Sequence, residues 1–178
     1  MNLEDAVRKR FSARAYKDEK VDREKLAYCL ELVRHSPSAR NGQPYKFIVC
    51  DEENLVKQIA EATQTPGVPI NRYTRNVPCF IAIAGEKAGL KKALATQAHF
   101  HYDAYDIGIA VQTFCLAATD AGLDTCIIGW FGRNKLAKLL DLPKNKEIRL
   151  LIAVGEGGAE YKARKKKSTE ELVSYNKY

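Results

Sequence analysis

Residues 36–44 read Ser-Pro-Ser-Ala-Arg-Asn-Gly-Gln-Pro, and they separate a stretch with helical periodicity from a stretch typical of a β-strand. The two prolines and the glycine exclude a helix through this segment, because proline has no backbone N–H and glycine lowers helix propensity. The remaining loop is dense in short hydrogen-bonding side chains. Such a composition suits the binding of a flat polar ligand, but it is also typical of a rigid turn. Taken alone, the segment favours the turn.

Length and composition indicate one domain spanning residues 1–178, large enough to bury a sizeable core. The hydrophobic fraction of 46% and the charged fraction of 29% are typical of a soluble globular protein. No run approaches the ~20 apolar residues that cross a bilayer, and the N-terminus lacks the basic-then-apolar pattern of a secretion signal. We therefore expect a cytoplasmic protein that makes no use of a membrane.

The five cysteines are odd in number and widely scattered, and each lies within an apolar run. None forms a CxxC pair, and the three histidines are not near them, so a zinc site is not expected. Buried free thiols in a reducing cytosol fit this pattern best. The residues concerned are Cys29, Cys50, Cys79, Cys115 and Cys126.

The formal net charge of +7 implies an anionic partner, and much of the excess lies between Lys162 and Lys167. No RNP-like aromatic motif or DNA-binding helix pair accompanies these charges, so nucleic acid is the weaker alternative. A small molecule carrying a phosphate would use basic residues equally well.

Outward from the central loop, helical and strand-like periodicities alternate along the chain. The run 77–84 is apolar without interruption and is expected to be a central strand buried on both faces. The longest helical pattern, from about His99 to Ala121, would span ~35 Å. Strands separated by helices indicate an α+β or a three-layer α/β domain. Further helices are expected at 2–9 with Asn2 as the N-cap, at 22–36 with Asp22 as the cap, from Asp51 or Glu52 to Ala62, and at 134–140; further strands at 45–50, 125–128 and 147–154; and an irregular loop at 65–76.

Arg10, Ser12 and Arg14 alternate at a spacing of two, which places them on one side of an extended segment. Two guanidiniums and a hydroxyl on one side could bind a phosphate or a polarised carbonyl group. A solvated edge segment with incidental charge explains the pattern about as well. The glycine-rich phosphate-binding motifs GxGxxG and GxxxxGK[ST] do not occur.

Five motifs in this order resemble the nitroreductase family of flavoproteins, and they cover nearly the whole chain. The family fold is an α+β, three-layer α/β/α sandwich with a mixed, mostly antiparallel sheet around a long central helix. The resemblance implies that fold for this chain. The motifs are Arg10–Tyr16, Ser36–Pro44, the long helix with Asp106-Ile-Gly108 and Leu116–Leu123, Ile128–Trp130, and Val154-Gly-Glu followed by Arg164-Lys-Lys166 and Thr169–Leu172.

The resemblance also implies a function. Family members are homodimers that bind FMN tightly at the dimer interface, are reduced by NAD(P)H, and reduce nitroaromatics, quinones or related acceptors in a ping-pong cycle. The C-terminal tail, about 159–178, has little apolar surface of its own and is expected to pack on the partner subunit.

By the same resemblance, each motif supplies part of a cofactor site. Arg10 and Ser12 would lie toward the FMN phosphate and ribityl chain, and Arg14 nearer the ring. The loop would reach the flavin of the other subunit, and the segment 128–130 would run past the ring. The implied contacts are Arg10, Ser12, Arg14, Pro37, Ser38, Ala39, Arg40, Asn41, Ile128, Gly129, Trp130, Arg164 and Lys166, with Asn71 as a further ring contact.

No side-chain acid, base or nucleophile and no metal are expected, because the flavin itself carries the chemistry. A flavin-binding storage or sensor protein with little turnover is the alternative. The sequence does not choose between NADH and NADPH, and the acceptor stays open.

Overall fold

The computed structural model describes residues 1–87, 102–158, 160–161 and 164–178. Its four strands form one sheet in the order β1-β2-β4-β3, and every neighbouring pair is antiparallel. Within the described residues the only parallel pairing is an isolated bridge between Ser12 and Thr125. The four strands thus form an antiparallel sheet, and in the described chain the parallel part of the expected mixed sheet is limited to this bridge. The strands are β1 (Tyr45–Cys50), β2 (Cys79–Glu86), β3 (Asp124–Ile128) and β4 (Lys146–Gly155).

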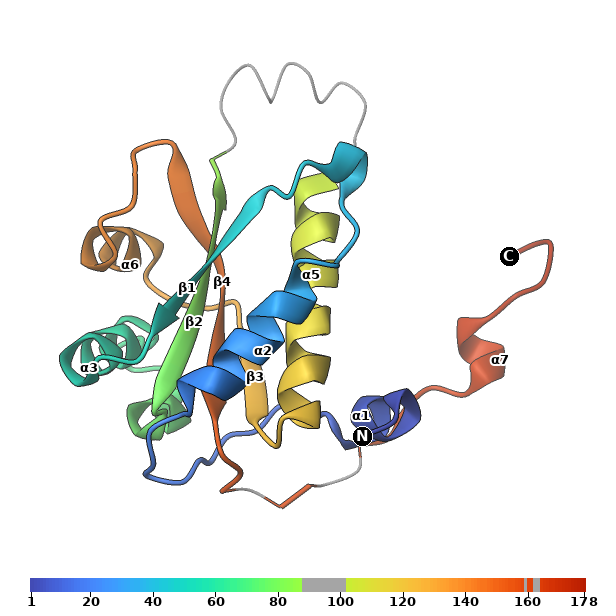
Figure 1. Ribbon diagram of the computed structural model, residues 1–178, viewed down its shortest axis with the longest axis horizontal. Coiled ribbons are helices and arrows are strands. Elements are labelled where there is room, and N and C mark those ends of the chain that lie inside the picture. Colours follow the sequence, from blue (N-terminus) through green and yellow to red (C-terminus); the bar gives the residue numbers. More distant parts are fainter. Residues whose placement is uncertain (88–101, 159, 162–163) are drawn as a thin grey trace.

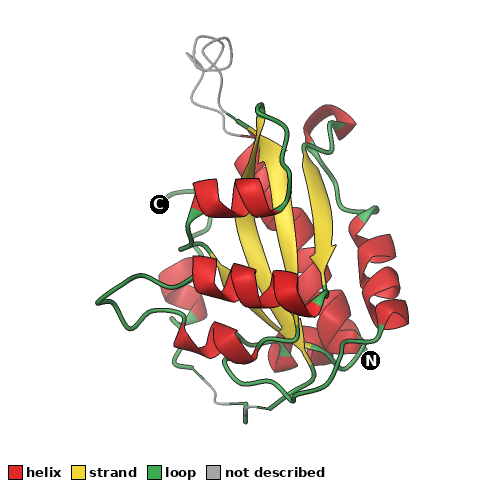
Figure 2. Cartoon of the chain, turned by 90° about the vertical axis from the view of Figure 1, so that its left-hand side faces the viewer, coloured by secondary structure: helices red, strands yellow, loops and turns green. Residues whose placement is uncertain are grey.

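Helices cover both faces of this sheet and give three layers (Figures 1 and 2). Alternate residues of β2 point to opposite faces. Ile81 and Ile83 join the core with α2 and α5, whereas Phe80 and Ala82 join the core with α3 and α6. The expected three-layer α/β/α sandwich with a long helix is confirmed. The helices are α2 (Arg23–Val33), α3 (Glu53–Ala62), α5 (Tyr102–Asp120) and α6 (Arg133–Leu139).

Strand β2 confirms the central strand expected at 77–84, shifted by two residues. Every residue from Cys79 to Gly85 is buried. Strands on both edges and helices on both faces leave no side of β2 exposed to solvent. This is why the sequence shows an uninterrupted apolar run rather than an alternating one.

The expected caps are present at the first two helices. Asn2 accepts a hydrogen bond from the Asp5 N–H at the start of α1 (Leu3–Lys9). Asp22 likewise accepts the Glu24 N–H at the start of α2, at 2.8 Å. These side chains bind backbone donors that the first helical turn leaves free.

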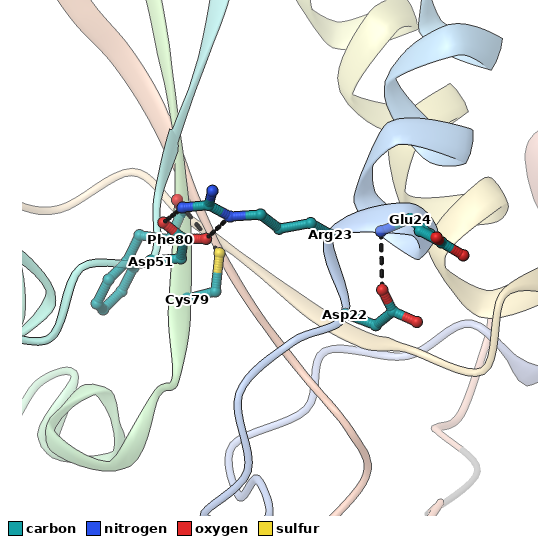
Figure 3. A network of polar contacts seen from close by, with 6 residues as sticks. All are labelled: Asp22, Arg23, Glu24, Asp51, Cys79 and Phe80. Carbon is teal, nitrogen blue, oxygen red and sulfur yellow. Dashed lines mark hydrogen bonds and ion pairs between the residues drawn. The ribbon is translucent and has the colours of Figure 1, made fainter.

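The cap of the third helix, α3, is Glu52 rather than Asp51, because the Glu52 side chain accepts the N–H groups of Asn54 and Leu55. Asp51 has a different partner. Figure 3 shows the Arg23 guanidinium binding it through two hydrogen bonds, at 2.7 and 2.9 Å. This pair connects α2 to the end of edge strand β1, and it lowers the pKa of Asp51.

Two loops contain short 3-10 helices that the sequence did not indicate, η1 (Ala39–Asn41) and η2 (Arg72–Asn76). The segment 65–76 was expected to be irregular throughout. A helix of three to five residues is too short to show a repeating apolar face, which explains the difference.

The C-terminal tail carries a single-turn helix, α7 (Thr169–Leu172), with a capping box between Ser168 and Glu171. It extends away from the layers (Figure 1), and the side chains of Leu172 and Tyr175 are largely exposed. That the tail packs on a partner subunit stays a prediction.

The first residues of the helix expected from His99 and most of the segment 86–97 lie outside the described residues. All five cysteines are described, and all are buried and free, as expected. Among the described helices, none has the length and apolar character to cross a bilayer.

Candidate functional site

The segment after α1 and the basic tail line one cleft of about 1180 Å³. It brings together five of the site residues proposed from sequence, which lie some 150 positions apart in the chain. The two walls meet where the rings of Phe11 and Tyr161 pack edge to face, with centroids 5.6 Å apart. The lining residues are Val7, Arg8, Lys9, Arg10, Phe11, Ser12, Arg14, Glu160, Tyr161, Arg164 and Lys166.

The N-terminal wall is fixed by backbone pairing with the sheet. The Ala13 N–H donates to the Thr125 carbonyl at 3.0 Å, at the start of β3. The segment is extended, and Ala13 is buried between the exposed residues Ser12 and Arg14. Tyr16 is also buried although it lies three residues after Ala13, so the expected alternation is present at 12–14 and does not continue to residue 16.

Farther along, this segment lies against the chain that follows β4. The Lys17 N–H donates to the Glu156 carbonyl, and the Gly158 N–H donates to the Ala15 carbonyl. A Cβ atom at Gly158 would come within 2.8 Å of the Tyr16 backbone. Only glycine lets the two segments approach so closely, and this approach leads the chain from β4 toward the basic tail.

The cleft is rich in cations that have no internal partner. Across the described residues, Arg10, Arg14, Arg164 and Lys166 form no ion pair, whereas Arg8 is paired with Glu4. Glu160 is the one acidic residue in the lining. Unpaired guanidiniums beside the Ser12 hydroxyl are the donors that bind a phosphate group, and their summed charge attracts anions. The donor set and the volume of the cleft fit a phosphate-bearing cofactor such as FMN.

A second group of proposed residues assembles where β3 ends. The Asn71 side-chain amide donates to the Trp130 carbonyl at 2.9 Å and to the Thr63 carbonyl at 3.3 Å. The Trp130 indole N–H donates to the Thr65 hydroxyl at 2.9 Å. These bonds hold the backbone of 129–130 in place.

The side chains in this second group differ in what they can contact. The Ile128 side chain is buried in the core, so only its backbone is available to a ligand. The Trp130 side chain, in contrast, is 59% exposed.

Tyr73 of η2 connects this second group to the cleft. The Arg14 guanidinium lies over its ring, 5.9 Å from the centroid. The Tyr73 hydroxyl donates to the Cys126 sulfur at 3.2 Å. Burial and this hydrogen bond raise the pKa of Tyr73, so the hydroxyl keeps its proton. The sequence shows no periodic signal for Tyr73, which is the one aromatic residue in the loop 65–76, and the residue was missed.

The third group, Pro37–Asn41, does not join the cleft within one chain. The Ala39 N–H donates to a carboxylate oxygen of the buried Asp106 at 3.1 Å, near the start of α5. Helix α1, whose last residues line the cleft, lies beside the other end of α5 (Figure 1), where the Met1 amino group pairs with Asp120. Asp106 and Asp120 lie on one helix, α5, at a separation along its axis of ~21 Å.

The loop backbone adopts an unusual conformation. Arg40, Asn41 and Gln43 have φ values of 55°, 53° and 42°, in the left-handed region that residues other than glycine rarely adopt. The Ser38 hydroxyl accepts the Gln43 N–H at 3.1 Å and helps to hold this shape. Strained backbone of this kind concentrates at functional sites.

Comparison with known proteins identifies the family of the chain. The model of the Nitroreductase family matches residues 7–156. An FMN reductase [NAD(P)H] of Bacillus subtilis is 30% identical, over 92% of this chain and 69% of its own length. An oxygen-insensitive NADPH nitroreductase of Helicobacter pylori is 27% identical, over 82% of each chain.

Solved structures show the same relationship. The nitroreductase family protein of Clostridium novyi NT superposes with a TM-score of 0.76 at 28% identity, covering 88% of this chain and 85% of its own. The order of the motifs, the three-layer fold and the family match lead to one conclusion. The chain belongs to the nitroreductase family.

Proposed function

We propose that this chain is an FMN-dependent oxidoreductase that takes a hydride from NAD(P)H and reduces electron-poor acceptors such as nitroaromatics and quinones. The observation that carries the proposal is the cleft, in which Arg10, Arg14, Arg164 and Lys166 lie together and form no ion pair with any described residue. The relatives support it by name, since one is an FMN reductase [NAD(P)H] and another an NADPH nitroreductase.

In this proposal, the ends of the cleft have different tasks. Arg164 and Lys166 bind the FMN phosphate, and Arg10 and Ser12 bind the phosphate and the ribityl chain. A phosphate monoester carries close to two negative charges, and guanidinium groups bind it through paired hydrogen bonds. The Arg14 guanidinium lies over the Tyr73 ring, and we assign it to the side of the isoalloxazine ring.

FMN, when bound, supplies the chemistry by accepting a hydride from NAD(P)H and passing the electrons to the acceptor in a separate, ping-pong half-reaction. The protein's part is electrostatic. A fixed cation beside the N1–C2=O edge of the ring, the task of Arg14, stabilises the negative charge of the reduced form. Asn71 holds the backbone of 128–130, and this backbone would border the flavin ring when FMN is bound.

The proposed enzyme is a homodimer of single-domain chains, in which Pro37–Asn41 of one copy completes the cleft of the other. The distance between this loop and the cleft of its own chain supports an exchange between copies. Exposed apolar side chains at a spacing of four also support it, because such stripes are typical of interfaces. They are Leu3 and Val7 of α1 and Tyr105 and Ile109 of α5.

A reducing, cytoplasmic location is part of the same proposal. It is supported by the five free, buried thiols.

The direct test is flavin content. Purified protein should be yellow, lose its flavin on acid treatment, and take up added FMN again with one FMN per chain. A colourless protein that fails to take up FMN would exclude the proposal. Steady-state NAD(P)H oxidation with a quinone then tests turnover, and bound FMN without such oxidation would indicate a storage or sensor protein.

A further inference from the structure

We infer that Tyr73 is a positioning residue that holds the Arg14 guanidinium against the proposed cofactor. The inference rests on the proposed binding of FMN. Tyr73 lies in η2, a segment for which the sequence indicated no regular structure. This segment would fix the charge of Arg14, because the extended segment that carries Arg14 does not.

Arg14 is poorly constrained by its own surroundings. Its backbone is held, since the neighbouring Ala13 N–H bonds to Thr125. Its side chain is exposed and makes no ion pair with any described residue. A long side chain in this situation samples many rotamers, and a cation that moves stabilises a developing charge less well than a fixed one.

Tyr73 is, in contrast, held at both ends. Its ring packs against the buried core of the α3 and α6 side, and its hydroxyl bonds to the buried Cys126. The next residue, Thr74, is fully buried and shares a 2.7 Å hydrogen bond with Thr63. Gln64 donates to the Thr74 hydroxyl as well. The ring of Tyr73 is therefore a rigid surface.

The contact between the two residues is the geometry that orients a guanidinium. A planar cation within about 6 Å of a ring centroid is attracted to the face of the aromatic quadrupole, and the Arg14 to Tyr73 distance of 5.9 Å lies within that limit. Tyr73 does not line the cleft itself. It acts through Arg14, so its removal should alter the environment of the flavin ring more than the binding of the phosphate.

The test is the midpoint potential of bound FMN in a set of variants. Arg14→Ala should lower the potential, because it removes the cation. Tyr73→Leu should lower it by a smaller amount, and Tyr73→Phe, which keeps the ring face, should stay close to the native value. In the double variant, the Tyr73→Leu change should add nothing to the shift of Arg14→Ala, because the two residues act as a unit.

Controls separate positioning from a general loss of structure. The matched control is Tyr28→Leu. Tyr28 lies on α2, and its hydroxyl donates to Asp120 at the end of α5. This variant should leave the potential unchanged. If Tyr73→Leu does not fold, Tyr73→Met replaces it, since methionine fills a similar volume without a π face.

The results distinguish this inference from the proposed function. If the native protein takes up no FMN, the proposed function fails and the inference with it. If the variants bind FMN with native affinity but Tyr73→Leu leaves the potential unchanged, only the inference is wrong. Shifts of Tyr73→Leu and Arg14→Ala that add in the double variant would also overturn it, because a residue acting through Arg14 cannot act in its absence.

Discussion

The cleft and the loop 36–44 lie at opposite ends of α5, and they are built on opposite principles. The cleft is lined mainly by long side chains, and the charges of Arg10, Arg14, Arg164 and Lys166 have no ion-pair partner among the described residues. The loop is made of backbone in a rare conformation, fixed by internal hydrogen bonds and by the buried Asp106. The positive charge of the cleft can thus be neutralised by an anionic ligand, whereas the loop has its shape before any ligand binds.

The largest effect is expected from removing charge in the cleft. The double variant Arg164→Ala/Lys166→Ala should weaken FMN binding by about 100-fold or more, because a charge-assisted hydrogen bond contributes roughly 1.5–3 kcal/mol. Lys165→Ala/Lys167→Ala is the matched control, since it changes the net charge equally at positions that do not line the cleft. Fluorescence titration with FMN measures both, and equal losses in the two variants would contradict the specific role of Arg164 and Lys166.

Loss of the loop's anchor should have a smaller effect. Asp106→Ala removes the acceptor of the Ala39 N–H and should weaken FMN binding by about tenfold, corresponding to ~1.4 kcal/mol for one buried hydrogen bond. Asp106→Asn keeps an acceptor oxygen and should retain most of the affinity.

Mixed dimers test whether the loop serves the partner subunit. They contain one Asp106→Ala chain, with a native cleft, and one Arg164→Ala chain, with a native loop. If each loop completes the cleft of the other chain, one site combines both native parts and the other site combines both defects. Half of the sites should then bind FMN with native affinity. If no sites of native affinity appear in the mixed dimers, the loop does not serve the partner.

Relief of backbone strain should act in opposite directions on stability and binding. Arg40→Gly places glycine at a φ of 55° and should raise the free energy of unfolding by about 1 kcal/mol. FMN affinity should fall a few-fold, because the side chain is a proposed contact. Denaturant unfolding and FMN titration measure the two. Arg34→Gly, at a φ of −59°, is the control and should give no gain in stability.

The smallest expected effect is a difference in salt dependence. Added salt screens the cleft cations, so FMN affinity should fall with ionic strength in the native protein and equally in Asp106→Ala. The fall should be shallower in Arg164→Ala, which has one cation fewer. A shallower dependence in Asp106→Ala would mean that the loop, too, acts through charge.

Features of the structure that leave a pattern over several residues could be predicted from the sequence. Features that depend on a single tertiary contact could not. The uninterrupted apolar run predicted β2, because a strand that is buried on both faces shows no alternation. The spacing of Arg10, Ser12 and Arg14 predicted a common face, because side chains in an extended segment alternate with a period of two, and all three residues line the cleft. The left-handed conformation of Arg40 had no sequence signal, since arginine does not favour it. Tyr73 was missed because its place depends on tertiary contacts with Arg14 and Cys126.

The two walls of the cleft lie some 150 residues apart in the sequence, and this has a consequence for synthesis. Residues 10–14 leave the ribosome well before Arg164 and Lys166, so the sheet and helices between them can fold while the second wall is still missing. A chain that stops before Arg164 should therefore fold its core and bind FMN only weakly.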